Sequence, residues 1–390
     1  MYYITVKQPP MYRQMTLDEL MWGAAEQSTL IRSNDTNTRT FELETVPFKY
    51  YKAFDIASII AKLSEFNVQT ERLHEADRKS LYREFHIPKK SGGLRKIDAP
   101  EPELMDALRR LKTIFEEDCG ADLLYHTSAF AYIKHRCTVD AVKRHQQNES
   151  RWFAKYDLSN FFGSTTIEYV MKMFGMVFPF CEVIKNEIGR RELERALDLA
   201  FLDGGLPQGT PISPIITNII MIPIDYKLCN GFRDFHYVKH DKCDARNFCV
   251  YTRYADDFIV SSKYDFDFKQ AERYIVETLA SFGAPFSINS KKTRYGSNAG
   301  SNWNLGVMLN KDNKITIGHK KKKQFQAMLC SFILDHQNGK PWEIGDVQAL
   351  EGYRNYYSSI EPGPIDGIVN HMGEKFGVDV RDMIKRILKG

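Results

Sequence analysis

The chain has 390 residues, of which 43% are hydrophobic and 27% charged, with a formal net charge of +4. This composition is ordinary for a folded protein and excludes a wholly disordered, collagen-like or coiled-coil chain. No apolar run reaches the roughly 20 residues that a membrane helix requires, and the N-terminus shows no secretory pattern. We therefore expect a cytoplasmic protein with no membrane partner. Seven scattered cysteines favour reduced thiols over a disulfide framework.

Positive charge is concentrated in two segments of this nearly neutral chain. Residues 83–96 carry five Lys/Arg against one acid, and residues 289–323 carry nine against one. Such clusters favour a polyanionic partner, with solvated surface faces as an equal alternative on charge alone.

In chain order, the pattern first predicts an accessory segment over residues 1–80. It contains a capping box at Thr16–Glu19 and an apolar periodic helix from about residue 53 to 66. Two extended runs around a Lys-Ser-Gly-Gly turn predict a hairpin with a basic tip over 87–97. An amphipathic helix is expected after Pro102.

From residue 150 the pattern changes to mixed strands and helices. Residues 152–158 indicate a buried strand that carries an acid near its end. Residues 250–254 and 258–262 predict a hairpin whose turn, 255–257, is Ala-Asp-Asp. Because strands and helices do not alternate strictly, an α+β domain is expected, followed by some seventy mostly helical residues.

Three carboxylates lie at these strand ends: Asp157, Asp256 and Asp257. Adjacent acids in an apolar context repel each other and resist desolvation, which a fold tolerates if a divalent cation neutralises them. Hard oxygen ligands suit Mg²⁺, and two such ions about 4 Å apart clamp the attacking and leaving oxygens of phosphoryl transfer. An isolated Asp-Asp pair is more often a polar turn, so the neighbouring motifs decide.

Three motifs occur in one order along the chain: Asp157 followed five residues later by Phe162, Gly205-Leu206-Pro207-Gln208-Gly209-Thr210-Pro211-Ile212-Ser213-Pro214 with Asn218, and Tyr254-Ala255-Asp256-Asp257. Together they resemble the palm of a reverse transcriptase. The resemblance covers about residues 80–360 and includes Ala129–Tyr132 with Arg136 and His145, Asn289–Thr293, Leu305–Val307 and Leu350–Tyr356. It implies an α+β right-hand polymerase fold with fingers, a palm built on an antiparallel sheet, and a helical thumb.

The same resemblance predicts the domain organisation. After the accessory segment 1–80, it places the fingers at 81–150 and the palm, with part of the fingers inserted, at 151–300. A primer-grip hairpin at 301–318 and a helical thumb at 319–390 complete the chain.

The resemblance also implies roles for individual residues. Asp157, Asp256 and Asp257 would be catalytic, and together with Leu158 they would bind two Mg²⁺ ions, for which Mn²⁺ is a substitute. The nucleotide-binding residues would be Lys89, Lys90, Arg95, Phe162, Gln208, Gly209 and Lys292. The template–primer would be contacted by Tyr254, Leu305, Gly306, Lys320, Lys321, Lys322 and Lys323.

Several of these roles have open alternatives. Phe162 stands where the family has a bulky aromatic that clashes with a 2′-OH, which would favour deoxynucleotides; the alternative is a core phenylalanine. Either Lys89 or Lys90 would reach the triphosphate. Lys292 resembles a lysine that protonates the leaving pyrophosphate, and a solvated lysine is the alternative.

A zinc site is a rival hypothesis for one cysteine–histidine cluster. His236, His240, Cys243 and Cys249 have the spacing H-x3-H-x2-C-x5-C, which could hold zinc tetrahedrally. The last spacing is loose, and Cys249 begins the strand that leads to the acids. We therefore favour ordinary residues of an inserted loop.

The expected function is an RNA-directed DNA polymerase that makes cDNA by two-metal nucleotidyl transfer, in antiphage defence. Its expected partners are an RNA template, a dedicated non-coding RNA, dNTPs, the DNA product and a protein of a defence operon. The alternatives are a template-independent or protein-primed DNA polymerase of a defence system, and a catalytically silent nucleic-acid-binding scaffold. The retron signature Asn-Ala-x-x-His is absent, and Leu305-Gly306-Val307 stands near the expected Val-Thr-Gly.

Overall fold

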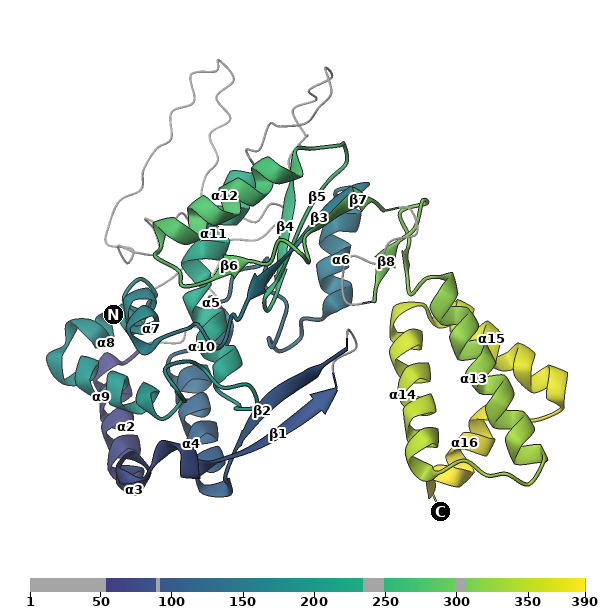
Figure 1. Cartoon of the computed structure of the whole chain (residues 1–390), viewed down its shortest axis with the longest axis horizontal. Helices are drawn as coiled ribbons and strands as arrows, with labels where there is room; N and C mark the ends of the chain where they lie inside the picture. The colour runs from purple at the N-terminus through teal and green to yellow at the C-terminus, as the bar shows by residue number, and fades with distance from the viewer. Residues whose placement is uncertain (1–53, 89–91, 234–248, 299–305, 390) are drawn as a thin grey trace, which may run out of the picture. The chain divides into compact units, whose positions relative to one another are not determined.

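The structure is a computed structural model that describes residues 54–88, 92–233, 249–298 and 306–389 (Figure 1). It divides into two compact units made of interleaved segments. Unit 1 holds the described residues up to Lys134, Leu158–Gly231 and Glu272–Asn289, and unit 2 holds His135–Asp157, the described residues between Phe232 and Ala271, and those from Ser290 onward. Within these described ranges, no helix combines the length and apolar character that crossing a bilayer demands. The six cysteines in them are free thiols.

Unit 1 is mainly helical. Its elements are α2 (Ile56–Gln69), α3 (Glu71–Glu75), η1 (Arg78–Leu81), β1 (Tyr82–Pro88), β2 (Leu94–Pro100), α4 (Pro102–Thr113), η2 (Ile114–Asp118), α5 (Ala121–Leu124), α7 (Ile167–Phe174), α8 (Phe180–Lys185), α9 (Glu187–Asp198), α10 (Ser213–Ile220) and β6 (Ser287–Ile288), together with most of α11 (Ile222–Arg233) and of α12 (Phe268–Ser281).

Unit 2 combines a sheet with a helical C-terminal part. Its elements are α6 (Thr138–Gln147), β3 (Trp152–Ser159) as far as Asp157, β4 (Val250–Tyr254), β5 (Asp257–Ser262), β7 (Arg294–Ser297), β8 (Met308–Leu309), β9 (Ile315–Thr316), α13 (His319–Gln337), α14 (Ile344–Ile360), α15 (Pro362–Phe376) and α16 (Val380–Lys389).

Local sequence signals account for the early elements. Asp55 caps α2, its carboxylate accepting hydrogen bonds from the amides of Ala57 and Ser58. The predicted hairpin is confirmed and extends further than expected, because β1 and β2 pair antiparallel from Tyr82 opposite Pro100 to the tip. The amphipathic helix after Pro102 is confirmed as α4.

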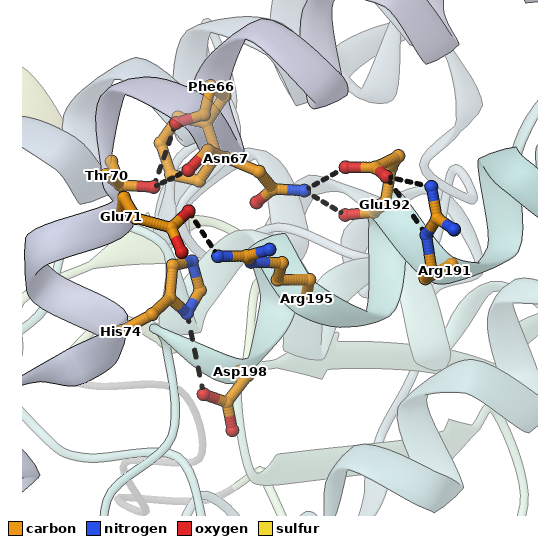
Figure 2. Close-up of polar contacts among 9 residues, drawn as sticks. All are labelled: Phe66, Asn67, Thr70, Glu71, His74, Arg191, Glu192, Arg195 and Asp198. Carbon is orange, nitrogen blue, oxygen red and sulfur yellow. Dashed lines mark hydrogen bonds and ion pairs between the residues drawn. The ribbon is translucent and has the colours of Figure 1, made fainter.

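Polar side chains of α2 and α3 form hydrogen bonds and an ion pair with α9 within unit 1 (Figure 2). Asn67 donates hydrogen bonds to the carbonyl and the carboxylate of Glu192, at 2.9 and 2.8 Å. One turn further along α9, Arg195 pairs with Glu71. Helix α2 therefore packs on α9 and Glu71 of α3 adds an ion pair, contacts that the sequence analysis did not predict.

The sheet of unit 2 is antiparallel, with β3 between β5 and β7 and β4 on the outer side of β5. The last residues of β3, Leu158 and Ser159, belong to unit 1 and pair with β6 there. The core of unit 2 joins Phe153 of β3 and Ile259 of β5 to apolar residues of α6 and α13–α16, such as Leu329. The predicted α+β fold class and the helical C-terminal part are both confirmed.

Candidate active site

Strand register brings the predicted catalytic acids together. Asp157 on β3 lies directly opposite Asp257 on β5. Tyr254 pairs with Asp257, so Ala255 and Asp256 form the two-residue turn between β4 and β5. Ala255 has a φ of 55°, a left-handed conformation that a non-glycine residue adopts rarely and at some cost. Asp256 is thus in this strained turn, which adjoins the strand pair that sets Asp157 opposite Asp257.

The environment of Asp256 disfavours a negative charge. Burial is the largest effect that raises the pKa of its carboxyl, and the charges of Asp257 and Asp157 raise it further. Its own backbone amide and Lys292 act in the opposite direction. Asp157 is itself only 8% exposed. A cation bound among these groups would relieve this repulsion.

Two lysines neutralise two of the three acids. The Nζ of Lys292 lies 3.0 and 2.9 Å from the two carboxylate oxygens of Asp157, and its side chain is 61% exposed. The Nζ of Lys155 lies 2.6 Å from Oδ2 of Asp257, and both of these side chains are largely buried. The ammonium group of Lys292 is thus accessible to solvent, whereas Lys155 is enclosed together with Asp257.

Lys155 was not among the residues that the sequence singled out. It precedes Asp157 by two positions, so both side chains stand on the same face of β3. It pairs with Ile259, so Asp257 is its diagonal neighbour on the adjacent strand. The i, i+2 spacing was visible in the sequence, but the partner depends on the register.

The donor set suits Mg²⁺. Magnesium prefers carboxylate oxygens and usually takes only one or two of them, completing its shell with water and substrate phosphates. In the part of the chain that the structure describes, no three His, Cys, Asp or Glu side chains form a complete metal site by themselves. Asp157 and Asp256 fit the partial set that Mg²⁺ requires. Leu158, whose side chain is buried, could contribute only its backbone carbonyl.

The predicted nucleotide-binding residues of the Gln-Gly loop are tied together inside unit 1. The amide of Leu206 donates to the carbonyl of Phe162 at 3.0 Å, and the amide of Asp98 donates to the carbonyl of Gln208 at 2.9 Å. Gln208 and Gly209 are both exposed. The loop is thus anchored by its backbone to both the predicted sugar-contacting aromatic and strand β2.

Gly209 cannot be replaced without strain. Its φ is 125°, and a Cβ added there would lie 2.9 Å from the carbonyl oxygen of Asp98 and 3.0 Å from the side chain of Ile97. Only glycine combines this backbone conformation with so close an approach. Arg95 lies on the same strand as these two neighbours, opposite Ile87.

The structure separates the predicted template–primer lysines into two kinds. Lys321 donates to the carbonyl of Gly306 at 2.8 Å, and Lys322 forms an ion pair with Glu361 at 2.7 Å. Lys320 and Lys323 are exposed on the first turns of α13. Of the four, the two exposed ones are the better placed to meet a polyanion. Tyr254 is partly buried at the end of β4.

Some predicted residues lie outside the described residues. These are Lys89, Lys90 and Leu305 of the polymerase sites, and His236, His240 and Cys243 of the zinc hypothesis. The fourth residue of that hypothesis, Cys249, is buried, and burial raises the pKa of its thiol to about 12.

Sequence reasoning also missed an uncharged face on α14. Residues at helical spacing along this face are exposed: Gly345, Gln348, Ala349, Gly352, Tyr353, Tyr356 and Ser359. A Cβ added at Gly352 would meet nothing within 4 Å, so no packing contact explains a glycine there. Glycine within a helix costs about 1 kcal/mol relative to alanine. The face is therefore exposed and uncharged, with two tyrosine rings on it.

The chain is similar to a known protein family, to individual members of it and to solved structures. The family model "Reverse transcriptase (RNA-dependent DNA polymerase)" matches residues 87–326, more than half of the chain. The retron Ec73 reverse transcriptase of Escherichia coli is 27% identical over 292 residues, covering 72% of this chain and 83% of that protein. The retron Ec83 reverse transcriptase of the same species is 26% identical over 318 residues, covering 79% and 91%. Apo telomerase from Candida tropicalis aligns with a TM-score of 0.46 at 12% identity, covering 85% of this chain and 64% of that one.

Proposed function

This chain belongs to the reverse transcriptase family of RNA-dependent DNA polymerases, and we propose that it makes cDNA by two-metal nucleotidyl transfer at Asp157 and Asp256. The observation that carries the proposal is the strand register, which sets Asp157 opposite Asp257 and places Asp256 in the adjoining turn. Asp257 completes the acidic cluster, with Lys155 as its fixed counterion.

The residues of the site divide the chemistry between them. When bound, Mg²⁺ would lower the pKa of the primer 3′-OH and stabilise the charge on the transferred phosphoryl group. The Nζ of Lys292, on an exposed side chain and 3.0 Å from Asp157, is the group in reach to donate a proton to the leaving pyrophosphate. Lys155 keeps Asp257 oriented and limits the repulsion within the cluster.

Unit 1 would bind the incoming nucleotide. Phe162 would exclude a 2′-OH by its bulk, and the exposed Gln208–Gly209 backbone would pack on the base pair. Arg95 on β2 would bind the triphosphate, since guanidinium groups hold phosphate oxygens by paired hydrogen bonds. Backbone hydrogen bonds join the Gln-Gly loop to Phe162 and to strand β2, so the three segments are held together.

Unit 2 would hold the template–primer duplex. Lys320 and Lys323 on α13 supply charge for the backbone, and the uncharged face of α14 supplies a surface on which a duplex can lie. Because the retron relatives match over most of their own length, we infer a retron-like enzyme with a dedicated non-coding RNA as template. A role in antiphage defence, with a partner protein from the same operon in the cytoplasm, extends this proposal.

Primer extension tests the proposal. Extension of oligo(dT) on poly(rA) with Mg²⁺ is measured for wild type, Asp256→Asn and the control Asp312→Asn, an exposed acid in the β8–β9 hairpin. We expect wild type and Asp312→Asn to incorporate dTTP and folded Asp256→Asn to lose at least about a thousandfold in rate, since an amide is a poor Mg²⁺ ligand. Wild-type rates from Asp256→Asn would refute the two-metal assignment.

The alternatives predict different products. Extension that proceeds equally without poly(rA) would indicate a template-independent polymerase, and product attached to protein would indicate protein priming. A chain that binds nucleic acid and never extends a primer, even on its co-purifying RNA, would be a scaffold. Sequencing the co-purifying nucleic acid identifies the native template.

A further inference from the structure

The segment between α5 and α6 holds an aromatic ring in solvent by means of a strained backbone. Tyr132 is 57% exposed, although Phe130, Ala131 and Ile133 around it are all buried. Its φ is 58°, in the left-handed region. For a bulky residue this is an outlier that costs about 1–3 kcal/mol and persists only where the surroundings impose it.

A buried amide bonds the backbone next to this residue. The Nδ2 of Asn218 donates a hydrogen bond of 2.8 Å to the carbonyl of Ala131, which directly precedes Tyr132. Asn218 is 1% exposed and lies on α10, which packs against α5. A buried side chain distant in sequence thus anchors the backbone carbonyl that directly precedes the strained residue.

The same helix directly follows the proposed nucleotide-binding loop. Helix α10 begins a few residues after Gln208, whose carbonyl accepts from Asp98 of β2, while Leu206 is bonded to Phe162. All these groups belong to unit 1. The backbone next to Tyr132 is therefore bonded to α10, the helix that follows the Gln-Gly loop. Both belong to unit 1, which is proposed to bind the nucleotide and its templating base.

The chemistry of the exposed ring favours stacking over charge attraction. The nearest charged side chain in sequence, Lys134, forms ion pairs with Glu116 and Asp122 and so has its charge largely neutralised. Proteins bind unpaired nucleic acid by stacking bases on exposed aromatic rings, and each such contact is worth about 1–3 kcal/mol. An exposed tyrosine is ordinary on a protein surface, whereas one exposed from a strained backbone position supports a hypothesis of function.

We propose that Tyr132 is a stacking platform for an unpaired base of the template strand ahead of the primer terminus. The inference rests on the proposed function, because it presupposes a templated polymerase. It adds a specificity element that distinguishes templates with a single-stranded overhang from blunt duplexes.

The test compares the affinity of two primer–template duplexes, one with a 5′ RNA overhang and one blunt, by fluorescence anisotropy. The variants are Tyr132→Gly, Tyr132→Phe and the control Leu123→Ala, which removes an exposed apolar side chain in the same unit. We expect Tyr132→Gly to bind the overhang duplex roughly tenfold more weakly, the low end of one stacked base. Its affinity for the blunt duplex should stay unchanged, as should both affinities of Tyr132→Phe and Leu123→Ala.

The melting temperature of the same variants separates function from structure. Glycine accepts a positive φ without strain, so Tyr132→Gly should melt at a higher temperature than wild type while it loses overhang affinity. A variant that is more stable and binds less well cannot owe its defect to unfolding.

Two results would overturn the proposal: wild-type overhang affinity in Tyr132→Gly, or an equal loss for both duplexes. Since the assay measures binding, it does not depend on turnover. If wild type extends no primer, the proposed function fails by itself; if wild type extends primers and Tyr132→Gly keeps its preference for the overhang, only the stacking platform fails.

Discussion

Acid should destabilise this protein through His145, a buried imidazole bonded to strands β4 and β5. On α6, its Nδ1 lies 2.6 Å from the hydroxyl of Ser261 on β5, and its Nε2 lies 2.8 Å from the hydroxyl of Thr252 on β4. The hydroxyl of Ser261 also donates to that of Ser150 at 2.7 Å. His145 thus joins α6 to both strands of the β4–β5 hairpin, whose turn and second strand contain Asp256 and Asp257. Burial lowers the pKa of His145 to about 3, with a smaller contribution from the charge of Arg144.

The size of the effect follows from this pKa. Below the ordinary histidine pKa of about 6.5 the unfolded chain takes up a proton at His145, whereas the folded chain stays neutral there until about pH 3. The unfolded state therefore binds more protons throughout this window, and stability falls as the pH falls. Each pH unit contributes about 1.36 kcal/mol, so the loss at this residue is about 2 kcal/mol at pH 5.

Urea unfolding of wild type and His145→Gln at pH 7 and pH 5 measures this loss. At pH 7 the variant should be less stable by about 1–3 kcal/mol, because buried hydrogen bonds are broken. Between pH 7 and pH 5, wild type should lose about 2 kcal/mol more than the variant does, so the two stabilities approach each other. The control is His371→Gln, which removes an exposed imidazole on α15. Equal pH dependence of stability in wild type and His145→Gln would refute the reasoning. If His371→Gln also loses less stability than wild type between pH 7 and pH 5, the effect does not belong to His145.

Four further substitutions test the site. Phe162→Ala should lower the preference for dNTPs over rNTPs, measured as a ratio of kcat/KM, by at least about tenfold, since the bulk under the sugar is removed; an unchanged ratio contradicts its role. Gly209→Ala should destabilise the fold by about 1–3 kcal/mol in urea unfolding, because of its φ and its contact with Asp98; wild-type stability argues against a required glycine. Lys155→Met and Asp257→Asn should each destabilise by about 1–3 kcal/mol and the double variant by less than their sum, as expected for a partly buried pair; additive effects mean the ion pair contributes nothing.

The elements that short-range patterns predicted are those whose cause is local. The capping of α2 by Asp55 and the burial of one face of α4 depend on residues within a turn or two of each other. The hairpin extended beyond its predicted bounds because pairing from Tyr82 to Pro100 continues past the turn residues that signalled it. Turn chemistry marks the middle of a hairpin, whereas its length depends on what the two strands gain by pairing.

The acids of the site were identifiable because their motifs resemble a known palm, and their partners were not. Lys155 and Asp257 are 102 residues apart, and they meet only because Lys155 pairs with Ile259 and so stands diagonal to the acid. A shift of one residue in that pairing would turn the side chain to the other face of the sheet. His145 is similar: the resemblance marked its position, but its two hydroxyl partners lie on strands more than a hundred residues further along the chain.

The backbone strain explains why sequence alone could not reveal Tyr132. Left-handed positions are usually foreseen from glycine or asparagine, and in this chain both Ala255 and Tyr132 adopt them. Ala255 lies in the turn of the paired β4–β5 hairpin, and the amide of Asn218 bonds the carbonyl that precedes Tyr132. Both residues stand where chemistry or binding is proposed, one next to Asp256 and the other at the surface of the nucleotide-binding framework. If strain at these two positions serves function, replacing either by glycine should stabilise the fold and weaken the enzyme, a pair of opposite effects that ordinary surface residues do not show.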